Sequence, residues 1–162
     1  MKENFRGKTL VISGATRGIG KAILYRFAEQ GVNIAFTYNK NEEEAQKIIN
    51  DVQNKYGVKI KTYPLNVLEP ETYKELFLTI DEDFERVDFF ISNAIIYGKS
   101  VVGGFAPFMR LKPKGLNNIY TATVLAFVIG AQEAAKRMQV VGGGSIISLS
   151  STGNLVYMPN YA

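Results

Sequence analysis

Residues 11–20 of the chain read Val-Ile-Ser-Gly-Ala-Thr-Arg-Gly-Ile-Gly. An apolar run ends at Ser13, three glycines follow, and a helical pattern begins at Lys21. A strand, a glycine turn and a helix start in this order form the arrangement that holds a dinucleotide pyrophosphate, because the free N–H groups and the dipole of a helix N-terminus favour an anion. The stretch therefore predicts a dinucleotide site.

Each glycine has an expected task in this turn. Gly14 permits a tight turn, Gly18 lets the backbone approach phosphate oxygens, and Gly20 lets the helix pack closely on the strand. The spacing is G-x-x-x-G-x-G rather than the more common G-x-G-x-x-G. Thr16, Arg17 and Ile19 lie in the same turn, and we also expect them to contact the cofactor.

The composition restricts the possible chemistry. With 46% hydrophobic and 21% charged residues in a chain of 162, a globular domain with a substantial core is expected. The chain has no Cys and no His. Disulfides, thiolate zinc sites and His-based catalysis are therefore excluded, no metal site is predicted, and acid–base chemistry falls to Tyr, Lys, Asp or Glu. A reducing cytoplasm is the expected location.

Charge and hydropathy argue against nucleic-acid and membrane partners. Residues 99–162 hold six of the 19 Lys and Arg residues but only one of the 15 acids, Glu133. This basic excess is small and dispersed. The N-terminus has no apolar signal region, and the uncharged stretch 116–132 holds too many polar residues for a membrane span.

Apolar runs alternate with helical periodicity along the whole chain. Spacings of three and four predict one helix after the glycine turn, one after Asn41 as N-cap, and one around Tyr73. A fourth helix is expected from Leu116 to Met138. The predicted strands are Lys8–Ser13, Asn33–Tyr38, Lys59–Leu65, Val87–Ser92 and Ser145–Leu149. This order predicts an α/β fold, a doubly wound parallel (Rossmann) sheet in one domain over residues 1–162.

Three motifs together resemble the short-chain dehydrogenase/reductases. The stretch 13–20 resembles that family's T-G-x-x-x-G-I-G fingerprint. Residues 88–94, Asp-Phe-Phe-Ile-Ser-Asn-Ala, resemble its D-x-x-x-N-N-A-G, and 145–151, Ser-Ile-Ile-Ser-Leu-Ser-Ser, resemble the fifth strand that ends on the catalytic Ser. The resemblance implies an NAD(P)-dependent oxidoreductase with Ser151 at the active site.

The position of the next tyrosine favours one branch of that family. Most members carry Tyr thirteen residues after the Ser, whereas here Tyr161 follows Ser151 by ten, as in enoyl-acyl-carrier-protein reductases. Residues 150–161 and 131–138 resemble the type III enoyl reductases. Most members have Asn in the fourth helix where this chain aligns Thr123, which weakens a carbonyl reductase interpretation.

The resemblance implies a role for each catalytic residue. Hydride transfer to the β-carbon of a 2-enoyl thioester places negative charge on the thioester oxygen, and the Tyr161 phenol would hydrogen-bond that oxygen. Ser151 would support the same oxygen. A lysine after the Tyr would lower its pKa from about 10 toward working pH, and that lysine falls beyond residue 162.

The end of the second strand bears on the choice of cofactor. An NAD enzyme usually places an acid there, but this chain has Asn39 and Lys40. Lys40 and Arg17 could pair with a 2′-phosphate, so NADPH is predicted. By resemblance, further cofactor contacts are Asn66 and Val67 beside the adenine, and Ser92, Asn93 and Ala94 through their backbone.

Partners are predicted on the same basis. The substrate would be an acyl thioester on acyl carrier protein, with the basic run from Met109 to Lys114 as a docking loop. The fourth helix is apolar nearly all round, as in the helices that form family tetramers. We expect the fold to be incomplete at its C-terminus, and a protein ending at Ala162 to bind NADPH poorly and reduce nothing.

Two alternatives stay open. A carbonyl reductase of the same family would act on 3-oxoacyl thioesters or hydroxysteroids. A nucleotide-binding domain without its catalytic half could instead serve as a sensor or assembly subunit.

Overall fold

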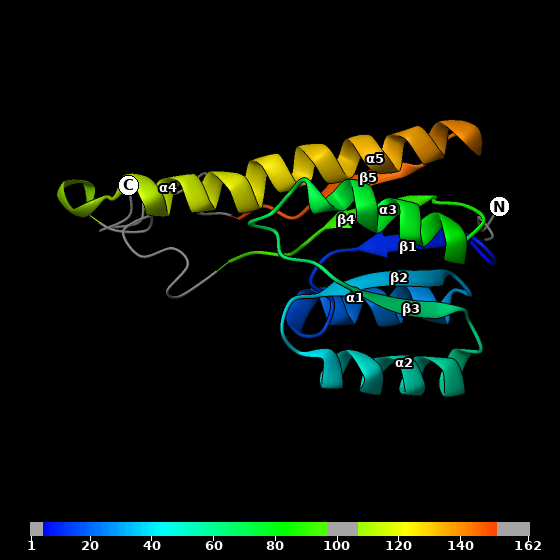
Figure 1. The fold of residues 1–162 in the computed structure, drawn as a ribbon. Helices are drawn as coiled ribbons and strands as arrows, with labels where there is room; N and C mark the ends of the chain where they lie inside the picture. Colours follow the sequence, from blue (N-terminus) through cyan, green and yellow to red (C-terminus); the bar gives the residue numbers. More distant parts are fainter. Residues whose placement is uncertain (1–4, 97–106, 152–162) are drawn as a thin grey trace.

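The computed structural model describes residues 5–96 and 107–151, and its strands form one parallel sheet. The spatial order is β3-β2-β1-β4-β5 (Figure 1). The strands are β1 (Thr9–Ile12), β2 (Asn33–Tyr38), β3 (Ile60–Pro64), β4 (Phe89–Ser92) and β5 (Ser145–Ser148). The predicted doubly wound parallel sheet is confirmed. Strands β1 and β3 are one residue shorter than predicted at each end, β4 begins two residues later, and β5 ends one residue earlier.

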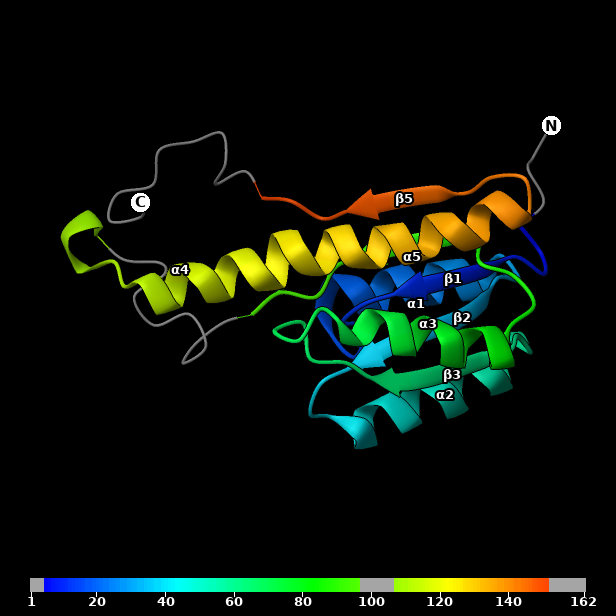
Figure 2. The same cartoon turned by 45° about the horizontal axis from the view of Figure 1, so that its top comes forward.

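Helices cover both faces of this sheet. Helices α1 and α2 lie on one face, and α3 and α5 lie on the other (Figures 1 and 2). The helical elements are α1 (Gly18–Glu29), α2 (Glu42–Tyr56), α3 (Thr72–Asp83), η2 (Phe108–Arg110), α4 (Pro113–Tyr120), η3 (Thr121–Leu125) and α5 (Ala126–Val140). Within the described ranges, none of them combines the length and apolar character needed to cross a membrane.

Alternation along the strands divides the core into two clusters. Leu10 and Ile12 of β1 pack toward α1 and α2, whereas Val11 between them packs toward α3 and α5. Period-two alternation sends successive side chains to opposite faces, and both faces are covered, so the run is apolar throughout.

The strand register brings the carboxyl ends of the strands to one edge. Ile12 of β1 pairs with Phe36 of β2 on one side and with Ile91 of β4 on the other. The chain proceeds from β1 toward β3 and then returns to β4, so the winding reverses between β1 and β4. Ligands of such sheets bind in the crevice at this reversal, outside the carboxyl ends.

The fourth predicted helix is wrong in its bounds and its regularity. It begins at Pro113, whose missing N–H is harmless in the first turn, and a π-helical segment, η3, separates α4 from α5. The Thr123 hydroxyl of this segment donates to the carbonyl of Ile119 in α4 at 2.7 Å. Tyr120 and Val124 are exposed, so the burial expected from the apolar pattern is not provided by the described residues.

Candidate nucleotide-binding site

The glycine turn leaves β1 and enters α1, and its geometry requires glycine. Gly14 and Gly18 lie in the left-handed region with φ of 69° and 55°. A Cβ on Gly14 would stand 2.9 Å from the Cα of Ala94, whereas a Cβ on Gly18 would meet no heavy atom of the described residues within 4 Å. The helix begins at Gly18, three residues before the predicted start at Lys21. Gly18 is therefore the first residue of α1, and no described residue fills the space beside its Cα.

Gly20 is closed in by the Asn93 side chain. A Cβ there would stand 2.4 Å from Asn93 Nδ2 and 2.6 Å from the Gly14 carbonyl oxygen. Asn93 Nδ2 donates to the carbonyl oxygens of Ser13 and Gly14 at 3.0 and 2.8 Å. The predicted close approach at Gly20 is present. The group that lies close to it is the Asn93 carboxamide, which bonds the turn to the end of β4.

The Ser13 hydroxyl makes the complementary contacts. Its Oγ accepts hydrogen bonds from the backbone N–H groups of Asn93 and Ala94 at 3.1 and 3.0 Å. On the other side, Gly14 N–H donates to Thr37 Oγ1 of β2 at 3.2 Å. Strands β1, β2 and β4 thus fix the turn together. Because the Asn93 and Ala94 N–H groups are already bonded, their contact with a cofactor would use other backbone atoms.

The start of α1 is suited to an anion. Arg17 is the N-cap residue, with an extended backbone, and its own side chain makes no capping hydrogen bond to the first N–H groups of the helix. The first turn contains no acidic residue. Arg17, Gly18 and Ile19 are exposed and Thr16 is half-buried. N–H groups without a capping side chain, beside an open glycine, fit the pyrophosphate of a dinucleotide.

The end of β2 presents amide and basic side chains, as predicted. Asn39 and Lys40 are both exposed immediately after β2. Asn41 then caps α2, its Oδ1 accepting from Glu44 N–H at 3.2 Å, which confirms the predicted N-cap. Neither Lys40 nor Arg17 forms an ion pair with any other described residue.

Three acids follow in the first turn of α2, and each has a partner. Glu43 pairs with Lys47 at 2.8 Å, and Glu44 with Lys21 of α1 at 2.9 Å. Glu42 acts on the Tyr38 hydroxyl: burial raises the pKa of Tyr38, and the charge of Glu42 raises it further. These carboxylates are therefore engaged elsewhere than with Arg17 and Lys40.

The predicted adenine contacts lie just beyond β3. Asn66 Oδ1 accepts from Leu68 N–H at 3.2 Å, and its Nδ2 donates to Glu69 at 2.8 Å. Val67 is buried in the core cluster of α3 and α5. Asn66 thus shapes the turn after β3, and Val67 could offer an adenine only its backbone.

The predicted catalytic residues follow β5. Ser148 is the register partner of Ser92, and Leu149 N–H donates to the Ser92 carbonyl at 3.0 Å. Ser151 is exposed and comes three residues after β5, at the same end of the sheet as the glycine turn. Tyr161 lies outside the described residues.

Sequence reasoning missed the side chains that hold the turn. Ser13 and Thr37 are hydroxyl residues at the ends of apolar strands, and this polar break was the available signal for their bonds. The Asn93 carboxamide contacts and the Lys21–Glu44 pair join residues far apart in sequence, and nothing local marks them.

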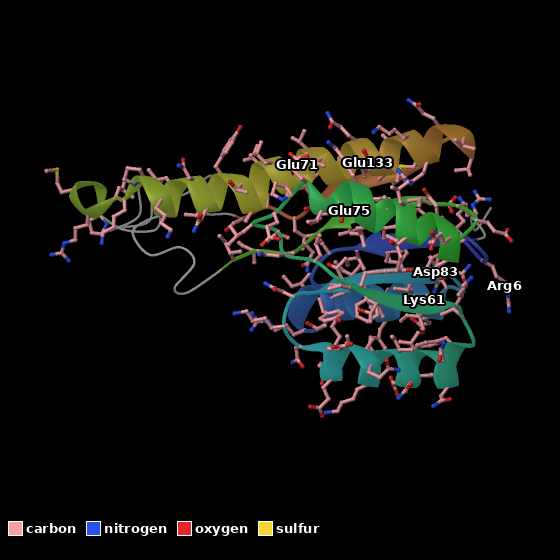
Figure 3. All side chains as sticks on the ribbon, in the orientation of Figure 1. Arg6, Lys61, Glu71, Glu75, Asp83 and Glu133 are labelled. Carbon is pink, nitrogen blue, oxygen red and sulfur yellow. The ribbon has the colours of Figure 1, made fainter. Side chains whose placement is uncertain are left out.

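Another polar cluster lies away from this site. Lys61 pairs with Asp83 toward the amino ends of the strands, near Arg6 (Figure 3).

A parallel sheet with an uncapped helix start after a glycine turn at its switch point defines a dinucleotide-binding Rossmann domain. Comparison with known proteins narrows this class. A family model described as enoyl-(acyl carrier protein) reductase matches residues 14–162. The chain belongs to the short-chain dehydrogenase/reductase family.

Individual relatives agree with this assignment. The chain is 32% identical over 157 residues to 1-cyclohexenylcarbonyl-CoA reductase of Streptomyces collinus, covering 97% of this chain and 53% of that protein. It is 27% identical to 3-oxoacyl-[acyl-carrier-protein] reductase of Staphylococcus aureus, covering 96% and 60%. The fold matches L-sorbose reductase of Gluconobacter frateurii, crystallised with NADPH and L-sorbose, with a TM-score of 0.88 and 24% identity, covering 99% and 59%. The chain thus spans about half to three fifths of these relatives.

Proposed function

We propose that the full-length gene product containing this chain is an NADPH-dependent enoyl-thioester reductase of fatty-acid synthesis. The observation that carries the cofactor choice is the pair of exposed cations, Arg17 and Lys40, which have no acidic partner among the described residues. Arg17 lies in the glycine turn and Lys40 follows the end of β2, and a 2′-phosphate would lie between these two segments. Cations in this position distinguish NADPH from NADH, which lacks that phosphate.

Three observations support an enoyl substrate. The matching family model is described as enoyl-(acyl carrier protein) reductase. The Streptomyces collinus relative is a reductase named for a cyclohexenylcarbonyl-CoA thioester. The interval of ten residues from Ser151 to Tyr161 is the spacing that resembles enoyl reductases.

The proposed residues divide the work as follows. NADPH, when bound, would supply a hydride for the β-carbon of the 2-enoyl thioester. The Tyr161 phenol donates a hydrogen bond to the thioester oxygen as it gains negative charge, with Ser151 in support. The uncapped N–H groups of α1 hold the pyrophosphate, and Arg17 and Lys40 hold the 2′-phosphate. A solvent proton at the α-carbon completes the reduction of the double bond.

The proposal extends to partners and location. The exposed cations Arg110, Lys112 and Lys114 form a basic segment suited to an acidic acyl carrier protein. We place the protein in the cytoplasm as a homotetramer, in which the exposed apolar side of α4 and α5 meets a second copy.

A carbonyl reductase is the second candidate. The similarity to the Staphylococcus aureus 3-oxoacyl reductase favours it. Its reaction would deliver the hydride to a carbonyl carbon, with Tyr161 donating a proton to the oxygen.

One assay separates the two candidates. The full-length product is mixed with NADPH and either crotonyl or acetoacetyl thioester, and absorbance at the NADPH band is followed. We expect faster oxidation with crotonyl thioester, and at least a hundredfold loss in the Tyr161→Phe variant. Faster reduction of acetoacetyl thioester would replace the first candidate with the second. Turnover by a protein that ends at Ala162 would contradict the expectation that such a protein reduces nothing.

A further inference from the structure

Lys21 lies in the first turn of α1, four residues after the N-cap residue Arg17. Its backbone N–H donates to the Arg17 carbonyl at 3.2 Å, so this bond ties Lys21 to the end of the glycine turn. Its Nζ lies 6.0 Å from the centre of the Tyr25 ring, and Tyr25 packs against Tyr56 of α2 with ring centres 6.5 Å apart. Lys21 thus adds a second cation next to Arg17 of the glycine turn, on the side of α1 that meets α2.

The partner of Lys21 belongs to the helix that follows Lys40. Lys21 Nζ and Glu44 Oε1 are 2.9 Å apart, and the two side chains are 37% and 32% exposed. Glu44 lies in the first turn of α2, where its N–H donates to Asn41 Oδ1. The ion pair therefore joins the first turn of α1, which follows Arg17, to the first turn of α2, which follows Lys40.

From this placement we propose that the Lys21–Glu44 ion pair sets how strongly the site prefers a 2′-phosphorylated nucleotide; this rests on the proposed nucleotide-binding function. In the wild-type protein Arg17 and Lys40 attract the phosphate, and Glu44 neutralises the third cation, Lys21. The pair thereby limits the preference for a 2′-phosphorylated nucleotide.

Electrostatics predicts opposite effects from the two halves of the pair. Removing the Glu44 charge releases the Lys21 cation toward the phosphate. Removing the Lys21 charge leaves an uncompensated carboxylate that repels the phosphate. NADH has no 2′-phosphate, so its affinity serves as an internal reference within every variant.

The test measures Kd for NADPH and for NADH by fluorescence, using the full-length product at low salt. The ratio of Kd for NADH to Kd for NADPH should rise about three- to tenfold in Glu44→Gln and fall by a similar factor in Lys21→Met. The double variant should return near the wild-type ratio, and 0.5 M salt should reduce both shifts. Thermal unfolding without nucleotide checks that each variant is folded.

Glu29→Gln is the matched control. Glu29 pairs with Arg26 near the far end of α1, so this variant releases a cation with the same change in net charge but away from the nucleotide. Its ratio should stay within about twofold of wild type. Equal changes in both affinities, or no change in either single variant, would overturn the inference alone. Failure of the wild-type protein to bind either nucleotide would overturn the proposed function and this inference with it.

Discussion

Ser13 shows how one small side chain holds a ligand-binding turn. A hydroxyl oxygen has two lone pairs, and Ser13 Oγ uses both, accepting from Asn93 N–H and Ala94 N–H. Ser13 is almost fully buried, so water cannot replace these bonds. The end of β4 is thereby held against the turn that precedes α1.

Ser13→Ala should therefore destabilise the protein. The substitution leaves two N–H groups without their acceptor, for an expected loss of about 2 kcal/mol in the free energy of unfolding. Because the turn loses two of its bonds to the end of β4, nucleotide affinity should also fall severalfold. Urea unfolding and fluorescence titration of the full-length product measure the two effects.

Ser13→Thr is the matched control, since it keeps the hydroxyl and the family fingerprint has Thr at this position. It should stay within about 1 kcal/mol of wild type. Ser13→Ala unfolding at the wild-type urea concentration would show that the two bonds do not hold the turn.

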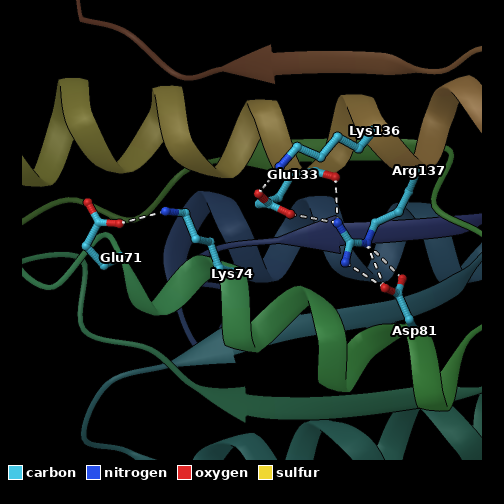
Figure 4. Close-up of polar contacts among 6 residues, drawn as sticks. All are labelled: Glu71, Lys74, Asp81, Glu133, Lys136 and Arg137. Carbon is cyan, nitrogen blue, oxygen red and sulfur yellow. Dashed lines mark hydrogen bonds and ion pairs between the residues drawn. The ribbon is translucent and has the colours of Figure 1, made fainter.

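At the scale of elements, α3 and α5 are joined by a charged network as well as by apolar contacts (Figure 4). Arg137 of α5 pairs with Asp81 of α3 at 2.6 Å and with Glu133 at 2.9 Å, and it lies over the Phe77 ring. Lys136 bonds to Glu133 at 2.6 Å. Glu133 is mostly buried, so removing its charge takes away the negative charge that Lys136 and Arg137 share.

This network predicts a pH-dependent contribution from Glu133. Burial alone would raise the pKa of Glu133, but the hydrogen bonds from Lys136 and Arg137 outweigh burial and lower it. A lowered pKa in the folded state means that the contribution is complete above the unfolded value of 4.5 and is lost as pH falls through the folded value. Glu133→Gln should cost about 1–3 kcal/mol at pH 7, and urea unfolding should show that difference shrinking below pH 4.5.

Glu71→Gln provides the comparison. Glu71 pairs with Lys74 at 3.2 Å, and both side chains are largely exposed. Exposed pairs contribute little, so this variant should change stability by less than about 1 kcal/mol at pH 7. A Glu133→Gln effect no larger than that of Glu71→Gln would mean that the network does not join the helices.

Local sequence patterns predicted most helices and strands because the spacing of apolar residues in an element reflects which of its faces are buried. The strands read as apolar runs since both faces of the sheet are covered, and α2 showed both its cap and its apolar stripe. The π-helical segment η3 was not predicted. The sequence there is apolar on nearly all sides, so it has no apolar stripe whose position would reveal a change in the number of residues per turn. Its Thr123–Ile119 bond depends on backbone geometry, which residue types do not record.

The same distinction holds for the site. Gly14, Gly18 and Gly20 could be predicted from ten consecutive residues because the turn is local. The contacts that fix the turn join Ser13 to Asn93, 80 residues away, and Gly14 to Thr37. Such contacts depend on which strands become neighbours, and spacing along the chain does not contain that information.

At the scale of the whole molecule, an apolar surface remains along the fourth helical region. Tyr120, Val124 and Val128 recur every four residues from α4 through η3 to α5, and they are 53%, 41% and 40% exposed. Figures 1 and 2 show α4 projecting past the carboxyl ends of the strands. Contiguous exposed apolar side chains of this kind mark protein contacts more often than single ones do.

If this surface joins copies of the protein, as proposed for a homotetramer, a charge on it should separate them. Val128→Glu would bury a carboxylate in the contact, so sedimentation of the full-length product should show a smaller species with an unchanged far-ultraviolet circular dichroism spectrum. Leu78→Glu is the control, because Leu78 is an apolar side chain that is 62% exposed on α3 and not on α4, η3 or α5. It should sediment as wild type. A Val128→Glu protein that keeps the wild-type mass would place the contact elsewhere, and equal dissociation in both variants would show that added charge alone separates the copies.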